Sequence, residues 1–336
     1  MASISTLGQQ LNLVARMKDI QANMSKYQQQ VTTGVKHNSF ADYGVDSLKI
    51  QRYRASLKEL EAYSYNIANA QVNISQMNQA IDENMKQAQN ILAAIGLQLP
   101  KGEEFSMETI RQAANTALQV IESNVNTEIG GRYLFSGSDV TNKPYTGGSG
   151  ATNNIAQQVS NWLDGTVDTD AFISGLDGMT DTEMGFSTTV QTAKKIYARA
   201  DDSYEVDYTV KANNDGFKKV INGLRALTQM EYPEGTDVAN KDNFYAVINH
   251  VYASIKSGID DMRAEASKLG TASSALEVMT TNHQNDTQSL QVVLENTEAA
   301  DTTDAIIRFQ TLQTQLEASY NITSIVSQLS LARFLN

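Results

Sequence analysis

The sequence contains no cysteine, three prolines and three histidines among its 336 residues. The absence of cysteine excludes a disulfide framework, thiolate metal sites and a cysteine nucleophile. The histidines are far apart in sequence, which leaves few groups for general-base catalysis or metal ligation. Charged residues make up 19%, against about 25% in an ordinary soluble domain. We therefore expect no catalytic residues, no cofactor site and no metal site.

Acidic residues outnumber basic ones, and most of the excess lies in the middle of the chain. The net charge of −12 divides into +2 for residues 1–100, −10 for 101–267 and −4 for 268–336. Nucleic acid is not an expected partner, because phosphate contacts need clustered lysine and arginine. No stretch approaches 18 consecutive apolar residues, so membrane insertion is not expected either. The N-terminus lacks the pattern of a cleavable secretion signal.

The positions of the prolines leave both ends of the chain free to form long helices. They are Pro100, Pro144 and Pro233, and proline inside a helix costs about 3 kcal/mol. Near the N-terminus, apolar residues recur in steps of four and three, which is the heptad spacing of a coiled coil. They predict a helix over about residues 5–33, and they are Leu13, Met17, Ile20, Met24, Tyr27 and Val31.

Two further helices are predicted in the first half of the chain. Apolar residues repeat at intervals of seven from Leu60 to Ile95, which indicates a long supercoiled helix. Gly96 and Pro100 are expected to end it. The third helix is predicted over about 106–128, with Ser106 as its N-cap.

The C-terminal third repeats the N-terminal pattern. Helical periodicity runs from Phe244 to Val293 and breaks at 298–301, where Asp301 can cap a new helix. The last helix has heptad-spaced apolar residues at Phe309, Leu312, Leu316, Val326 and Leu329. These five residues and the six N-terminal ones are here called the seam. Because their patterns match, we predict that the two terminal helices pair and that the seam drives assembly.

The middle of the chain has a different character. Gly130 and Gly131 end the third helix, and residues 132–135 are a short aromatic strand candidate. Residues 204–210 alternate apolar and polar side chains, as a half-buried strand does. We therefore expect a mainly α protein. Long N- and C-terminal coiled-coil helices would form an elongated rod, with a small α+β insert in the middle.

Several acidic and polar residues could be taken for functional sites. The acidic run from Asp164 to Asp181 lacks the ligand spacing of a calcium loop, so a solvated surface is expected. Glu205 and Asp207 have no histidine or apolar pocket nearby that would make them an acid–base pair. Asn84, His283 and Asp286 occupy apolar-stripe positions. All three are expected to be buried and to make polar contacts that fix helix register.

Residues at both ends resemble the flagellin family. The first helix opens with Ser3-Ile4-Ser5-Thr6 and closes with Val31-Thr32-Thr33-Gly34, and the last contains Ala318-Ser319-Tyr320 and ends near Leu329-Ser330-Leu331. Residues 130–138 are similar to the glycine–Arg–Tyr–aliphatic–Phe–small–Gly motif of the hook-associated proteins that join hook to filament. Its residues here are Gly131, Arg132, Tyr133, Phe135 and Gly137. The resemblance covers about 1–138 and 265–336.

The resemblance implies a structural, non-enzymatic subunit of the extracellular bacterial flagellum, exported without a cleaved signal peptide. Residues 1–45 and 300–336 would form a terminal coiled-coil domain lining the tube. Residues 46–135 and 233–299 would form a helical rod domain, and 136–232 an outward-facing variable insert. Within the family, the motif favours a hook–filament junction subunit.

The implied partners are further copies of the chain in a ring or helical array, another hook-associated protein, flagellin subunits and a flagellar export chaperone. Two alternatives stay open. One is a filament flagellin with the same fold. The other is a surface adhesin whose insert stacks glycans on Tyr133, Tyr145, Trp162 and Tyr208.

Overall fold

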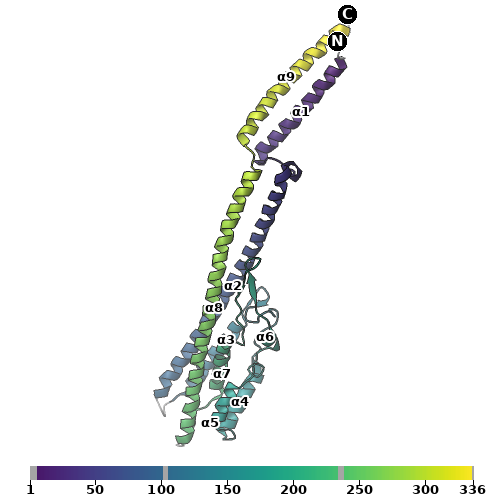
Figure 1. The fold of residues 1–336 in the computed structure, drawn as a ribbon. Coiled ribbons are helices and arrows are strands. Elements are labelled where there is room, and N and C mark those ends of the chain that lie inside the picture. The colour runs from purple at the N-terminus through teal and green to yellow at the C-terminus, as the bar shows by residue number, and fades with distance from the viewer. Residues whose placement is uncertain (1–5, 101–104, 234–237, 335–336) are drawn as a thin grey trace. The chain divides into compact units, whose positions relative to one another are not determined.

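The computed structural model describes residues 6–100, 105–233 and 238–334 and is mainly α-helical (Figure 1). The long helices are α1 (Thr6–Thr33), α2 (Ser47–Gln98), α8 (Val238–Glu298) and α9 (Thr302–Phe334), with a 3-10 segment η1 (Phe40–Asp46) between α1 and α2. The shorter ones are α3 (Met107–Val125), α4 (Gly148–Leu163), α5 (Thr169–Asp177), α6 (Thr188–Thr192) and α7 (Asp215–Gln229). The strands described are β1 (Glu128–Ile129), β2 (Arg132–Tyr133), β3 (Tyr197–Arg199) and β4 (Glu205–Asp207).

The chain divides into two compact units. Unit 1 comprises Met1–Leu60 and Gln284–Asn336, and unit 2 comprises Glu61–His283. Helices α2 and α8 contribute residues to both units. Residues 136–232 fall within unit 2, together with the helical segments that flank them in sequence.

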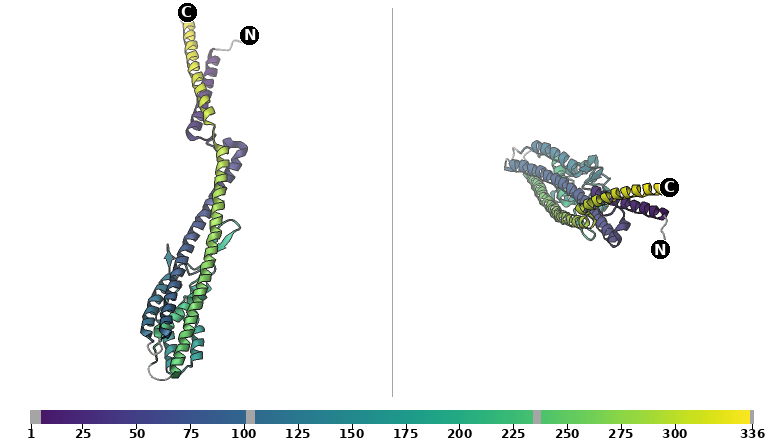
Figure 2. Two further views of the ribbon diagram at one scale, coloured as in Figure 1. Left: turned by 90° about the vertical axis from the view of Figure 1, so that its left-hand side faces the viewer. Right: turned by 90° about the horizontal axis from the view of Figure 1, so that it is seen from above.

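In unit 1, α1 and α9 pack along one another in opposite directions (Figure 2). Near the middle of the pair, Gln21 Nε2 donates a hydrogen bond to Tyr320 Oη at 3.1 Å. Beyond its base, Val35 and Ala299 form an antiparallel β-bridge. The N-cap predicted for α9 is confirmed, because the Asp304 amide donates to Asp301 Oδ1 at 3.0 Å.

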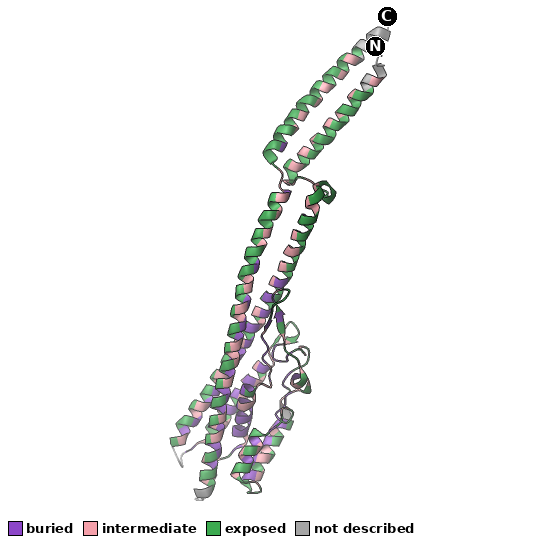
Figure 3. Cartoon of the chain, viewed as in Figure 1, coloured by how far each residue is buried: buried purple, intermediate pink, exposed green. Residues whose placement is uncertain are grey.

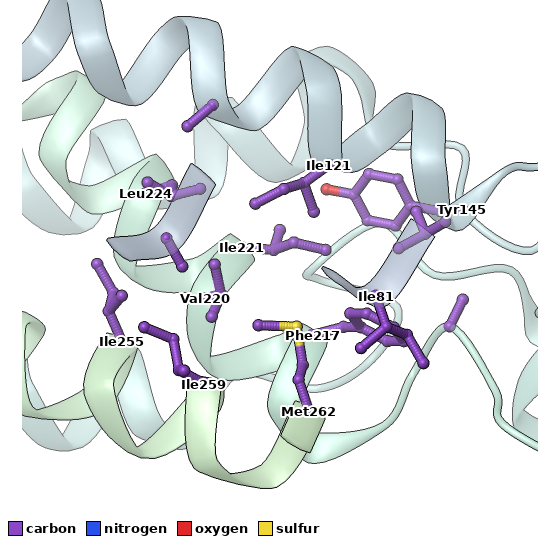
Figure 4. Close-up of a cluster of buried hydrophobic side chains, with 14 of the residues drawn as sticks. Ile81, Ile121, Tyr145, Phe217, Val220, Ile221, Leu224, Ile255, Ile259 and Met262 are labelled. Carbon is purple, nitrogen blue, oxygen red and sulfur yellow. The ribbon is translucent and has the colours of Figure 1, made fainter. Parts of the chain in front are cut away.

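Unit 2 contains the large hydrophobic core (Figure 3). The seven-residue repeat of α2 is confirmed as a buried stripe that includes Ile67, Ile74, Ile81, Ala88 and Ile95. Helix α7 is buried on nearly all sides, because α3, α4 and α8 pack around it. Figure 4 shows this centre, where side chains of α2, α3, α7 and α8 meet.

Polar contacts also cross the core of unit 2. Asn84 is fully buried, and its Oδ1 accepts a hydrogen bond from Asn124 Nδ2 at 2.8 Å, which confirms an interhelical contact between α2 and α3. His283 is buried as well, stacked on Tyr63 with ring centroids 5.8 Å apart. Its Nε2 lies 2.6 Å from the Ala200 carbonyl oxygen.

Three details of the sequence-based expectations were wrong. Asp286 is exposed rather than buried, because the fully buried stripe of α8 stops at His283. The strand expected over 204–210 is limited to β4, which pairs with β3, and Tyr208 and Val210 are buried beyond it. The strand expected over 132–135 is limited to β2, because Phe135 turns into the core and packs against Phe217.

Candidate assembly surface

The seam residues lie on the sides of α1 and α9 that are only partly covered. Five of the six in α1 are half-buried, and Val31 is exposed because Gln30 takes the half-buried position at the end of the helix. In α9, Phe309, Leu312, Leu316 and Val326 are half-buried. The side chain of Leu329 lies outside the described part of the chain. Among the described side chains of α1 and α9, Ala305 alone is fully buried.

The burial is incomplete because only two helices, α1 and α9, pack together here. A pair of helices covers each apolar stripe from one direction, so its side chains stay in contact with water. Helices derive most of their stability in water from packing of an apolar face. The α1–α9 pair therefore has apolar surface that a further helix or another chain could bury.

A second apolar stripe on α9 was not anticipated from the sequence. Ile307, Ile322 and Ile325 are each more than half exposed, and Thr311, Thr314 and Ala318 complete a row in steps of three and four. At 100° per residue, this row lies roughly 135° around the helix from the seam. The signal was present in the sequence as a second series at heptad spacing. This row gives the exposed face of α9 apolar surface that a partner could cover.

The loop between α1 and α2 adds further exposed apolar side chains to unit 1. Val45 is 88% exposed, Phe40 is also exposed, and so is Leu48 in the first turn of α2. The guanidinium of Arg54 lies 5.1 Å from the centre of the Phe40 ring. These residues extend the apolar surface of unit 1 beyond the α1–α9 pair.

Polar contacts fix the base of the α1–α9 pair. The Lys36 amide donates to Glu298 O at 2.7 Å, and the Lys36 ammonium lies 3.1 Å from Thr297 O. A cation at the last carbonyls of a helix is favourable, because those groups carry partial negative charge. Arg54 Nη2 donates to both carboxylate oxygens of Glu298, at 2.8 and 2.9 Å.

One ion pair lies within the first turns of α9. Arg308 forms an i, i+4 ion pair with Asp304 at 2.6 Å. This hydrogen bond and the charge of Asp304 raise the pKa of Arg308.

The motif residues of 131–137 form a turn structure. Gly130 and Gly131 have φ of +58° and +80° and close the β1–β2 hairpin, as a two-residue type I′ turn requires. Gly137 also has positive φ, and a Cβ there would lie 2.9 Å from Ala193 Cβ. Tyr133 is half-buried and Phe135 fully buried, whereas Arg132 is exposed. Four of the five motif residues therefore have structural roles, and Arg132 alone projects from the hairpin.

Other candidate sites in the sequence have structural explanations. Tyr145, Trp162 and Tyr208 are buried in the core of unit 2 and cannot present stacking faces to a glycan. Asp168 caps α5 by accepting from the Ala171 amide at 2.8 Å, and Asp207 pairs with Lys195 at 2.8 Å. In the ranges that the structure describes, no group of three or more acidic or histidine side chains is placed to hold a metal ion.

None of the described helices is long and apolar enough to cross a membrane. No curated protein matches the chain. Among solved structures, one from Vibrio parahaemolyticus, assigned as a flagellar hook-associated protein, is similar with a TM-score of 0.55 and 11% identity, over 77% of this chain and 100% of its own. Bacillus cereus FlgL gives a TM-score of 0.49 and 15% identity, over 73% of this chain and 98% of its own.

Two models of the same protein family match the two ends of the chain. The bacterial flagellin N-terminal helical region matches residues 4–140, and the bacterial flagellin C-terminal helical region matches residues 253–335. Together these matches cover more than half of the sequence and include both terminal helices and the hairpin motif. The chain therefore belongs to the flagellin family, and it is a structural component of the bacterial flagellum.

Proposed function

We propose that this chain is the subunit that joins the flagellar hook to the filament. The observation that carries the proposal is the segment from Gly131 to Gly137, whose hairpin and buried Phe135 give a structural reason for a motif similar to that of junction proteins. The Vibrio parahaemolyticus protein of similar fold, which is also named as hook-associated, supports it.

Each part of the chain has its own proposed position in the assembly. Residues 1–45 and 300–336 line the tube, where neighbouring copies cover the seam and the second stripe of α9. Residues 46–135 and 233–299 form the rod that contacts neighbours, and 136–232 face outward. Before assembly, an export chaperone holds the C-terminal helix. The conformational entropy that α1 and α9 lose when they become ordered is then offset by burial of apolar surface in the assembly.

Self-assembly of the purified chain distinguishes a junction subunit from a filament flagellin. A junction subunit stops after a short collar, because its next contact is with a different protein. We expect ammonium sulfate, with or without flagellar seeds, to give soluble chains or short collars in negative-stain electron microscopy. Protease should remove the termini and spare unit 2. Long filaments would show that the chain is a filament flagellin instead.

A further inference from the structure

A pocket in unit 2 is lined by the end of α5, the first half of α7 and the middle of α8. Its volume is about 350 Å³, which is within the size range of small-molecule sites. All of its lining residues lie between Leu176 and Ser257, and therefore within unit 2. The pocket thus involves neither the seam nor the second stripe of α9.

Asn222 of α7 lines this pocket and has an acceptor without a partner. The residue is 8% exposed, and its Nδ2 donates to the carbonyl oxygen of Leu176, which also lines the pocket. Its Oδ1 is buried and has no hydrogen-bond partner in the described part of the chain. A buried acceptor that is left unpaired destabilises the folded state. A ligand that donates a hydrogen bond to Asn222 would remove this cost.

The two lysines of the pocket are already neutralised by carboxylates of the same chain. Lys218 Nζ lies 3.0 Å from Asp215 Oδ1, and Lys219 Nζ lies 2.7 Å from Asp261 Oδ2. Both lysines are half-buried. An anionic ligand would have to displace these carboxylates or share their partners, whereas a neutral ligand leaves the ion pairs in place. The lining therefore favours a ligand without net charge.

The remaining polar groups of the pocket supply both donors and acceptors. His250 Nε2 lies 3.0 Å from Asp177 Oδ1, and both residues line the pocket. Ser254 and Ser257 of α8 add hydroxyl groups, each of which can donate and accept. A ligand with several hydroxyls matches this lining, because each of its hydroxyls can likewise donate to a carboxylate and accept from an ammonium group.

We propose that this pocket binds a neutral sugar ring. The ring hydroxyls pair with Asn222 and with the polar groups of α7 and α8. The apolar C–H face packs on Leu176, Met179 and Met184, which are buried residues of the same lining. Methionine side chains adapt to irregular apolar surfaces, which suits the uneven face of a sugar. The site is distinct from the aromatic residues considered above, since Tyr133, Tyr145, Trp162 and Tyr208 do not line it.

Saturation-transfer NMR on the purified full-length chain tests the proposal. The probes are the methyl glycosides of glucose, galactose and mannose, which represent the terminal residue of a glycan. At least one should bind with a Kd of about 1 mM, as expected for a ligand of this size. The free hexoses, titrated in parallel, represent dissolved sugars, and tighter binding of either series identifies the source of the ring. Glucuronic acid and glucosamine, which carry a charge, should bind at least about tenfold more weakly.

A bulky substitution in the pocket locates the binding. Ser254 is half-buried, and Ser254→Phe should fill the pocket and weaken binding at least about tenfold. The matched control is Ser267→Phe, an exposed position of α8 outside the lining, which should bind as the parent does. Asn222→Leu removes the unpaired acceptor and should also weaken binding about tenfold. The fluorescence of Trp162 checks that each variant is folded.

Three results would overturn the sugar-binding proposal. The first is an absence of saturation transfer to every neutral sugar at about ten times the expected Kd. The second is unchanged binding by folded Ser254→Phe, which would place the ligand elsewhere on the chain. The third is tighter binding of the charged sugars than of the neutral ones.

Discussion

Replacing Leu316 with aspartate should abolish incorporation of the chain into flagella while leaving unit 2 folded. Leu316 is half-buried in the seam between α9 and α1. In the assembly, we expect neighbouring copies to complete its burial, and an unpaired carboxylate buried there would cost several kcal/mol. The expected loss of incorporated protein is at least about a hundredfold, which corresponds to about 3 kcal/mol. Immunoblots of sheared flagella measure it.

The folded state of the variant is checked with the chain's single tryptophan. Trp162 lies in unit 2, buried and stacked on Phe172 with ring centroids 5.0 Å apart. Its fluorescence should match that of the parent chain. The matched control is Gln313→Asp, which places the same carboxylate on an exposed position of α9 and should be incorporated. Motile cells whose flagella contain normal amounts of the Leu316 variant would refute the role of the seam.

The second large effect is expected at Arg225, a charged residue that is only 2% exposed in the centre of unit 2. Its Nη2 donates to Glu122 Oε1 at 2.9 Å and to Tyr145 Oη at 2.8 Å, and its Nη1 donates to Thr152 Oγ1 at 3.0 Å. Burial raises the pKa of Tyr145, although the charge of Arg225 opposes the shift. One side chain thus connects α7 to α3, to α4 and to the segment before α4.

Arg225→Met should destabilise unit 2 by about 3 kcal/mol, because it removes the buried partner of the half-buried Glu122 and leaves the Tyr145 hydroxyl with fewer partners. Urea unfolding followed by Trp162 fluorescence measures this change. Adding Glu122→Gln should recover about half of the loss, since the unpaired charge is removed. The control Arg263→Met breaks an exposed ion pair with Asp260 and should cost less than about 1 kcal/mol. An Arg225 variant as stable as the parent would contradict this account.

The helices could be predicted from the sequence because their periodicity is local. The heptads of α1, α2 and α9 depend on residues three and four positions apart, and an interval of that size defines a helix face without knowledge of the fold. The Asp301 cap is equally local. Gly130 and Gly131 were expected to end the third helix, but that expectation was wrong, because α3 ends at Val125 and the two glycines close the β1–β2 hairpin with positive φ.

The contacts that could not be predicted join residues far apart in the chain. Arg225 and Glu122 are separated by 103 positions, and Arg54 and Glu298 by 244. No periodicity links such residues, so their pairing depends on the packed structure. The prediction that Asp286 is buried was wrong for the same reason. Asp286 continues the helical period of His283, but it lies where the buried stripe of α8 has ended. The second stripe of α9 could be read from the sequence, but it was overlooked because the seam in the same helix has the more regular apolar pattern.

The position of the chain in an isolated flagellum tests the central claim most directly. Because the chain has no cysteine, Ser203→Cys places a single thiol on the exposed turn between β3 and β4 of unit 2. Maleimide–gold labelling of flagella can then be imaged by electron microscopy, with the parent chain as the unlabelled control. Our account predicts one narrow band of label where the hook meets the filament. Label along the whole filament would contradict it. So would an absence of label on flagella of the variant strain that have both hook and filament.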